Sequence, residues 1–122
     1  MIRGVRGAVC ASANSREAIF EATKKLLVHM FAKNDIETEK IASIFLTATP
    51  DLNADYPAYA VREMGLTMIP MMCATEINVP GSLQRVIRVL IHLETNKGQS
   101  EIKHLYLGDA KRLRPDLAGG EE

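Results

Sequence analysis

The chain has 122 residues, of which 47% are hydrophobic and 25% are charged. This length and this balance are typical of one soluble globular domain, and they exclude a mainly disordered chain. The 15 basic residues are balanced by 15 acidic ones. A net charge of zero argues against general nucleic-acid binding, which normally requires a basic excess, but it allows a local positive pocket.

The lack of a recognisable targeting signal and the use of cysteine both predict a protein of the reducing cytoplasm. No apolar stretch of signal-peptide length follows Arg3 and Arg6, and no apolar run is long enough to span a membrane. Cys10 and Cys73 lie far apart, whereas a small secreted chain would need more cysteines for a disulfide framework. We therefore expect two free thiols. The three histidines show no metal-ligand spacing, so no metal site is expected.

The first half of the chain predicts two strands, one long helix and one short helix. Ile2–Val9 is rich in β-branched and small residues, and its glycines would allow another backbone to approach closely. Asn14 is expected to begin a helix over Ser15–Lys33, because apolar residues recur there with helical spacing. Ile41–Thr49 is interpreted as a buried strand, and Pro57 suits the first turn of a short helix.

The second half of the chain predicts three strands. Met68–Cys73 is apolar and bounded by turn signals, and Ile102–Leu107 alternates between polar and apolar residues. Val86–Glu94 also alternates, which favours a strand over a helix. The tail from Arg112 onward contains a proline, glycines and terminal glutamates, so we expect it to be mobile.

Together these elements predict a single α+β domain with about five strands and one covering helix. We assign the domain to residues 1–117 and expect residues 118–122 to form a flexible C-terminal tail. One helix covers only one face of such a sheet, and the other face, rich in Val, Ile and Leu, also needs a cover. A homo-oligomer is the most economical way to provide it.

Arg88 is the most unusual polar residue, because it interrupts an apolar run in a predicted strand. It fits either a solvent-facing position or a guanidinium that binds an anion. Glu76 follows a strand, where binding residues often lie, but alone it also fits a surface carboxylate. Cys73 alone fits a small buried residue, and Tyr106 could face the core or a ligand. No catalytic triad, phosphate loop or paired-carboxylate motif is found, so these residues indicate no more than an anion-binding domain.

The chain also carries short segments whose joint order and spacing are more specific than any one of them. They are Met1–Ala8, Ala48–Leu52, Tyr56–Ala58, Ala60–Glu63, Cys73 with Glu76, Leu83, Ile87–Val89, His104 with Tyr106–Leu107, and Leu113–Leu117. In this arrangement the chain resembles the small monofunctional chorismate mutases of the Bacillus type (AroH class), over nearly its whole length.

The resemblance implies a mixed five-stranded sheet with one long helix, assembled as a homotrimer. The three sheets would form a pseudo-barrel, with active sites in clefts between subunits. It also implies the Claisen rearrangement of chorismate to prephenate, in the biosynthesis of phenylalanine and tyrosine. One C–O bond breaks as one C–C bond forms within one molecule, so no cofactor and no metal is expected. Chorismate is the expected small-molecule partner, without nucleic acid or membrane.

The resemblance further implies roles for individual residues. Arg88 would lie beside the ether oxygen of chorismate. Arg6 and Tyr106 would hold the side-chain carboxylate, and Glu76, with Cys73 adjacent, would accept a hydrogen bond from the ring hydroxyl. Substrate-binding positions would be Cys73, Tyr56, Arg62, Leu113 and Arg114.

Two other functions stay open on the sequence alone. A reactive-imine deaminase shares the trimeric architecture and also uses an arginine in an interface cleft. An inactive trimer that binds small anions would keep the same pocket without turnover. The combination of Arg6 and Glu76 with Arg88 and Tyr106 favours the mutase over both.

Overall fold

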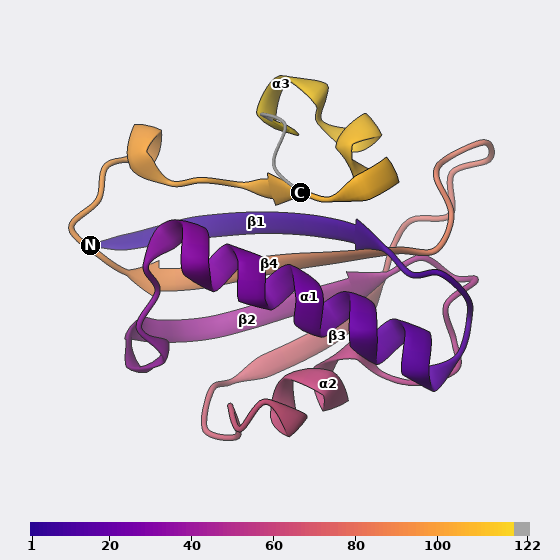
Figure 1. The fold of residues 1–122 in the computed structure, drawn as a ribbon, viewed down its shortest axis with the longest axis horizontal. Helices are drawn as coiled ribbons and strands as arrows, with labels where there is room; N and C mark the ends of the chain where they lie inside the picture. Colours follow the sequence, from indigo (N-terminus) through magenta and orange to yellow (C-terminus); the bar gives the residue numbers. More distant parts are fainter. Residues whose placement is uncertain (119–122) are drawn as a thin grey trace.

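The computed structural model describes residues 1–118, which form one mixed five-stranded sheet (Figure 1). The strands are β1 (Ile2–Cys10), β2 (Ile41–Ala48), β3 (Met71–Thr75), β4 (Val86–Glu94) and β5 (Leu105–Tyr106), in the order β3-β2-β4-β1-β5. β4 pairs antiparallel with both β1 and β2, whereas the edge strands β3 and β5 run parallel to their neighbours. The predicted α+β class and mixed five-stranded sheet are confirmed.

Helices α1 (Arg16–Asn34) and α2 (Pro57–Glu63) form a layer on one face of the sheet (Figure 1). α1 contacts β1 and β5, α2 contacts β2 and β3, and the two helices contact each other. The cover is therefore shared by two helices and not provided by α1 alone. The remaining short elements are η1 (Thr38–Lys40), η2 (Gln99–Glu101), η3 (Gly108–Leu113) and α3 (Pro115–Ala118).

The main core lies between the sheet and this helical layer, because alternate residues of each strand face the helices. Val5 and Ile44 of the sheet and Leu26 and Met30 of α1 are all fully buried in it. A Cβ atom at Gly7 would lie 2.5 Å from Sδ of Met30 and 3.0 Å from Cδ1 of Leu26. The glycine in β1 thus allows the close approach of α1 that its sequence context suggests.

The opposite face of the sheet carries no helical layer within residues 1–118. Only its β5 end is covered, where Ala110 of η3 packs with Ala8 and Tyr106. Farther along this face, Phe45 is 43% exposed, and Met72 on the edge strand β3 is 67% exposed. This uncovered sheet face is the feature that the sequence led us to expect, and it carries the site described below.

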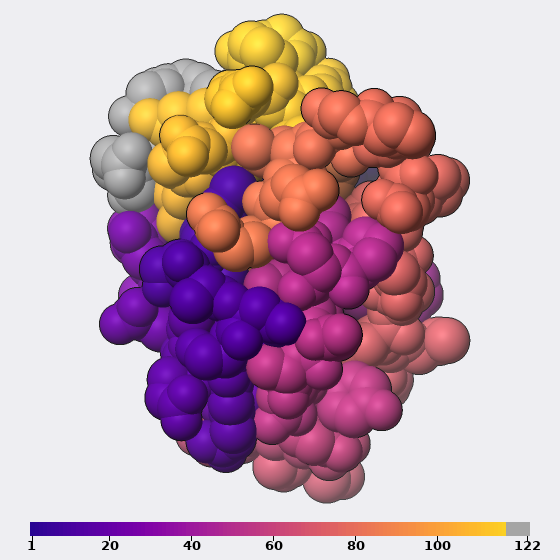
Figure 2. Space-filling view, turned by 90° about the vertical axis from the view of Figure 1, so that its right-hand side faces the viewer, coloured from indigo at the N-terminus to yellow at the C-terminus, as the bar shows by residue number. Residues whose placement is uncertain are grey.

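The loop between β3 and β4 projects from one end of the sheet (Figure 1). Figure 2 shows this end, where the loop, in salmon, stands beside the yellow C-terminal segment. Arg85 ends the loop in a left-handed conformation, with φ of 55°. Its backbone N–H donates to Oδ2 of Asp51 at 2.9 Å, and its Nε donates to the carbonyl of Ala11 at 3.1 Å. These bonds fix the start of β4 against two other segments.

The start of α1 differs by one residue from the prediction. Ser15, not Asn14, is the N-cap, and its Oγ accepts a hydrogen bond from the N–H of Ala18 at 3.1 Å. Oδ1 of Asn14 instead accepts bonds from the backbone N–H groups of Asn53 and Ala54. Both side chains can cap a helix, and the tertiary contact decides between them.

The two edge strands are shorter or shifted relative to the prediction. β3 begins at Met71, because Pro70 has no N–H to donate and only its carbonyl joins the ladder, accepting from Ile44 N at 3.0 Å. β5 contains two residues only, because its pairing with β1 stops at Gly7 and Ala8. Period-two alternation marks which residues face the core, but it does not show how far a partner strand extends.

The C-terminal segment after β5 is folded back on the sheet, contrary to the mobile tail expected from Arg112 onward. It forms η3 and then α3, which ends at Ala118. Leu113 packs against the small cluster around Tyr106, and this contact holds the segment in place. Of the expected flexible tail, residues 119–122 lie outside the described residues.

None of the helices in residues 1–118 is long and apolar enough to cross a membrane. In the same range, no group of three or more histidine, cysteine, aspartate or glutamate side chains is placed to hold a metal ion.

Candidate active site

A cavity of about 310 Å³ opens on the uncovered face of the sheet. We call it the arginine cavity, because three arginines line it. Its polar lining consists of Arg6, Thr47, Glu76, Arg88, Tyr106 and Arg114. The apolar part of the lining includes Phe45 and Leu90. The residues come from all parts of the chain, and the strand pairing brings them together.

Arg88 lies in the middle of β4, between Ala8 on β1 and Thr47 on β2. Its Nε is 3.3 Å from Oε2 of Glu76, and the two side chains are 44% and 22% exposed. Glu76 follows β3 directly, and its backbone N–H donates to the carbonyl of Ala48 at 2.9 Å. This bond fixes the backbone of Glu76 against β2, and the side chain extends from there to the guanidinium.

Thr47 contributes a third group to this pair. Its hydroxyl donates a hydrogen bond to Oε2 of Glu76, the same oxygen that faces Arg88. Within residues 1–118, Oε1 of Glu76 accepts no hydrogen bond and the two Nη atoms of Arg88 donate none. These polar atoms remain available to a bound molecule.

Arg6 and Tyr106 lie at the other side of the cavity. Tyr106 is only 3% exposed and pairs with Ala8, while Arg6 lies two residues earlier on β1. The backbone N–H of Arg6 donates to Nδ1 of His104 at 3.0 Å. Arg114 closes this side and donates two hydrogen bonds to Asp116, from Nε at 3.1 Å and from Nη2 at 2.9 Å.

His104 links the site to the stability of the protein. Burial lowers the pKa of His104, and the charges of Arg6 and Arg114 lower it further. A neutral ring with a free Nδ1 lone pair is the form that can accept the bond from Arg6. The unfolded chain would bind a proton at the ordinary pKa of about 6.5.

We therefore expect the free energy of unfolding to fall as the pH is lowered from about 6.5 through the depressed pKa of folded His104. In that window the unfolded state binds more protons; above it, His104 contributes no pH dependence. Chemical denaturation at several pH values measures the slope. His104→Asn, which keeps an acceptor near the Nδ1 position but does not titrate, should flatten the profile. Identical slopes in both proteins would contradict the expectation.

A sequence model of the family described as chorismate mutase type I matches residues 2–117. The chain belongs to this family. Chorismate mutase AroH of Thermus thermophilus is 43% identical over 122 residues, covering 99% of this chain and 100% of that protein. Chorismate mutase AroH of Bacillus subtilis (strain 168) is 41% identical over 119 residues, covering 97% and 94%. A solved chorismate mutase from Clostridium thermocellum has a TM-score of 0.88 and 46% identity, covering 90% of this chain and 98% of that one.

The chain is thus an enzyme of the isomerase class with chorismate mutase function. The resemblance that the sequence suggested is confirmed. Each of the relatives named above is described as a chorismate mutase.

The structure brings together five of the nine predicted site residues in the arginine cavity of the mutase. They are Arg6, Glu76, Arg88, Tyr106 and Arg114. Leu113 lies beside them but packs against the cluster of Tyr106 and does not line the cavity. The guanidinium of Arg62 lies over the ring of Tyr59, 5.1 Å from its centroid, on the α2 side of the molecule.

Cys73 and Tyr56 line a second cavity of about 540 Å³, which we call the α2 cavity. Cys73 pairs with the buried Leu46 and packs against the main core, so its side chain faces the helices. Burial raises the pKa of the Cys73 thiol, against the lowering effects of the Ala58 backbone and the charge of Arg62. Within one chain Cys73 is therefore not beside the Glu76 carboxylate, contrary to the expectation.

Thr47 and Phe45 line the arginine cavity but were not predicted from the sequence. Ile41–Thr49 was interpreted as a buried strand, and its residues were not assigned to separate faces. Ser43, Phe45 and Thr47 in fact share the uncovered face, two residues apart, while Ile44 and Leu46 are buried. The hydroxyls within that apolar run were the available signal.

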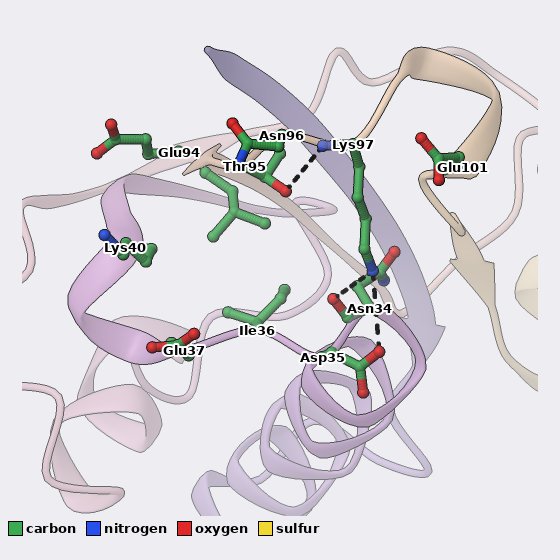
Figure 3. Close-up of a pocket in the computed structure, with 11 residues that line it drawn as sticks. Asn34, Asp35, Ile36, Glu37, Lys40, Glu94, Thr95, Asn96, Lys97 and Glu101 are labelled. Atoms are coloured by element: carbon green, nitrogen blue, oxygen red, sulfur yellow. Dashed lines mark hydrogen bonds and ion pairs between the residues drawn. The ribbon is translucent and has the colours of Figure 1, made fainter.

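A further cavity, of about 450 Å³, lies at the C-terminal end of α1 (Figure 3). Nζ of Lys97 donates to the backbone carbonyl of Asn34 at 2.8 Å and lies 4.0 Å from Oδ2 of Asp35. A lysine at this position satisfies a free carbonyl at the helix end and complements the negative end of the helix dipole. Lys97 therefore anchors the C-terminal end of α1.

Proposed function

We propose that the arginine cavity binds chorismate and that Arg88 stabilises the transition state of its rearrangement to prephenate. The single observation that carries this proposal is the arrangement around Arg88. Its Nε faces Glu76 at 3.3 Å, so the guanidinium is held in place while neither Nη atom donates a hydrogen bond within residues 1–118. A cation fixed in this way needs little reorganisation when charge develops beside it.

The reaction requires stabilisation of developing charge more than an enzyme group that forms or breaks bonds with the substrate. As the C–O bond of chorismate lengthens, negative charge builds on the ether oxygen. A fixed guanidinium beside that oxygen gains more in the transition state than in the ground state, and this difference accelerates the reaction. An arginine keeps its charge at any working pH and donates several parallel hydrogen bonds, which suits this role.

The rest of the cavity suits a small dianion. Arg6, Arg88 and Arg114 outnumber the single carboxylate of Glu76, so the lining has an excess of positive charge. Its volume of about 310 Å³ lies at the lower end of the range of roughly 300–1,000 Å³ for small-molecule sites. Arg6 and Tyr106 would hold the side-chain carboxylate, and the free Oε1 of Glu76 would accept a hydrogen bond from the ring hydroxyl. Such contacts would keep the flexible substrate in its compact form.

We further propose that the active site is shared between subunits of a homotrimer. The expected binding residues divide within one chain between the arginine cavity and the α2 side, where Cys73, Tyr56 and Arg62 lie. A neighbouring copy packed on the uncovered sheet face could bring its α2 cavity to the arginine cavity of the first. The exposed apolar side chains of Phe45 and Met72 favour burial of this face in an interface.

Subunit mixing tests this arrangement directly. Arg88→Ala removes the charge from the arginine cavity, and Arg62→Ala removes one from the α2 side. We expect each variant alone to have strongly reduced kcat/KM for chorismate. Co-expression with two different tags, followed by purification of the mixed oligomer, should recover part of the activity, because some sites then combine two intact halves.

The two possible arrangements give opposite results in this experiment. If one chain supplied the whole site, every site in the mixed oligomer would carry one lesion and no activity would return. An active Arg62→Ala homo-oligomer would remove Arg62 from the site.

The cytoplasm is the compartment we propose, because Cys10 and Cys73 are both free thiols.

A further inference from the structure

We infer that Thr47 is a positioning residue for catalysis: its hydroxyl orients the Glu76 carboxylate and, through it, the Arg88 guanidinium. This inference rests on the proposed roles of Glu76 and Arg88. Nothing in the sequence patterns that identified the site singles out Thr47. It emerges from the hydrogen bonding and from the register of the sheet.

The contact is specific in geometry. Thr47 on β2 lies directly opposite Arg88 on β4, so both side chains leave the uncovered face side by side. The hydroxyl of Thr47 donates to Oε2 of Glu76, and Nε of Arg88 faces that same oxygen at 3.3 Å. Thr47 therefore occupies the point at which β2, β4 and the residue that follows β3 present their functional groups to the cavity.

Because Thr47 and Arg88 both contact Oε2 of Glu76, the state of the other carboxylate oxygen, Oε1, depends on them. With Oε2 engaged by both Thr47 and Arg88, Oε1 of Glu76 accepts no hydrogen bond within residues 1–118. A carboxylate held by one donor could rotate and engage the guanidinium with both oxygens, as bidentate pairs commonly do. The hydroxyl of Thr47 opposes this rotation. It keeps Oε1 available for substrate and keeps the Nη atoms of Arg88 free of hydrogen bonds to the carboxylate.

The backbone alone does not provide this restraint. Glu76 is anchored to β2 by its N–H, which donates to the carbonyl of Ala48 at 2.9 Å, but its side chain has several rotatable bonds beyond that point. Thr47 is β-branched and lies in a strand, so its own side chain has few rotamers. A stiff hydroxyl on a central strand is well suited to fix a flexible carboxylate from an edge.

Thr47→Val tests the inference, because it keeps the shape and removes the donor. We expect kcat/KM for chorismate to fall by about tenfold or more, as is typical when a hydrogen bond to a charged group is lost. Thr47→Ser restores the hydroxyl and should return most of the activity. Thr47→Ala serves as a second variant without the hydroxyl if Thr47→Val does not fold.

Ser43→Ala provides a matched control on the same strand and the same face. The hydroxyl of Ser43 also bonds to a side chain of β4, since it lies 2.9 Å from Nδ1 of His92, but it does not line the arginine cavity. Its kcat/KM should stay within about twofold of the wild type. Thermal unfolding of all variants separates a loss of folded protein from a loss of turnover.

A double-mutant comparison shows whether Thr47 acts through Glu76. If it does, adding Thr47→Val to Glu76→Gln should lower kcat/KM little further. Wild-type activity of Thr47→Val, or failure of Thr47→Ser to rescue, would overturn the inference. If Glu76→Gln and Arg88→Gln were still impaired in that case, the proposed site would stand without Thr47. Wild-type activity of Glu76→Gln and Arg88→Gln would instead remove the proposed site, and the role of Thr47 with it.

Discussion

Arg88→Gln is expected to lower kcat for chorismate by about 10²- to 10³-fold, the loss typical of removing one preorganised donor from a site of developing charge. Glutamine keeps a polar side chain of moderate length but carries no charge. The effect should fall mainly on kcat, because the cation interacts most strongly with the transition state. Following the decrease in chorismate absorbance over a range of concentrations separates kcat from KM.

The fold should survive this change. The Arg88 side chain is 44% exposed on the uncovered face, and Glu76 keeps its bond from Thr47 when the guanidinium is removed. Arg112→Gln is a suitable control, since Arg112 is an exposed arginine of η3 that does not line the cavity. Near-normal kcat in folded Arg88→Gln would exclude Arg88 as the stabilising cation.

The sequence predicted the central strands and the long helix well, because burial on one face leaves a clear periodic pattern of apolar residues. β1, β4 and α1 were predicted within one residue at each end. The edge strands β3 and β5 were predicted less well, because their limits depend on where a neighbouring backbone offers a partner. The folded segment after β5 was missed for a related reason. Its Leu113 is stabilised by a tertiary cluster that its polar composition does not reveal.

The site could be predicted residue by residue only where a side chain breaks a pattern or matches a family motif. Arg88 does both, since it interrupts an apolar strand. Thr47 gives only the weak signal of a hydroxyl within an apolar run, because threonine is common in strands. Cys73 and Glu76 are close in sequence, yet one lines the α2 cavity and the other the arginine cavity. The spacing of a motif predicts that two residues belong to the site, but it does not predict which face of the sheet each side chain will occupy.

The positions of Arg6 and Tyr106 depend on a contact remote from the cavity. Both lie on the β1–β5 side of the sheet, and β5 has only two paired residues to hold it there. The segment before β5 is tied instead to the C-terminal end of α1. Asn34 there is 1% exposed. It is not a predicted site residue, but the placement of the site relies on it.

Asn34→Leu is therefore expected to destabilise the protein strongly, by roughly 2–4 kcal/mol, since each buried polar group left without a partner costs about 1–3 kcal/mol. Nδ2 of Asn34 donates to the carbonyls of Met30 and Lys103 at 3.0 and 2.9 Å, and its Oδ1 accepts from the N–H of Lys103 at 2.8 Å. Leucine has a similar volume but satisfies none of these groups. Denaturant unfolding followed by circular dichroism measures the change.

Asn96→Leu is the matched control for this prediction. Asn96 lines the same cavity at the end of α1 (Figure 3), but it is exposed, and its replacement should change the free energy of unfolding by less than about 0.5 kcal/mol. Equal destabilisation by both variants would mean that the bonds to Lys103 do not anchor the segment. Because Lys103 directly precedes His104, loss of the anchor should also weaken the bond from Arg6 to His104. At temperatures where Asn34→Leu is still folded, its KM for chorismate should therefore rise, whereas that of Asn96→Leu should not.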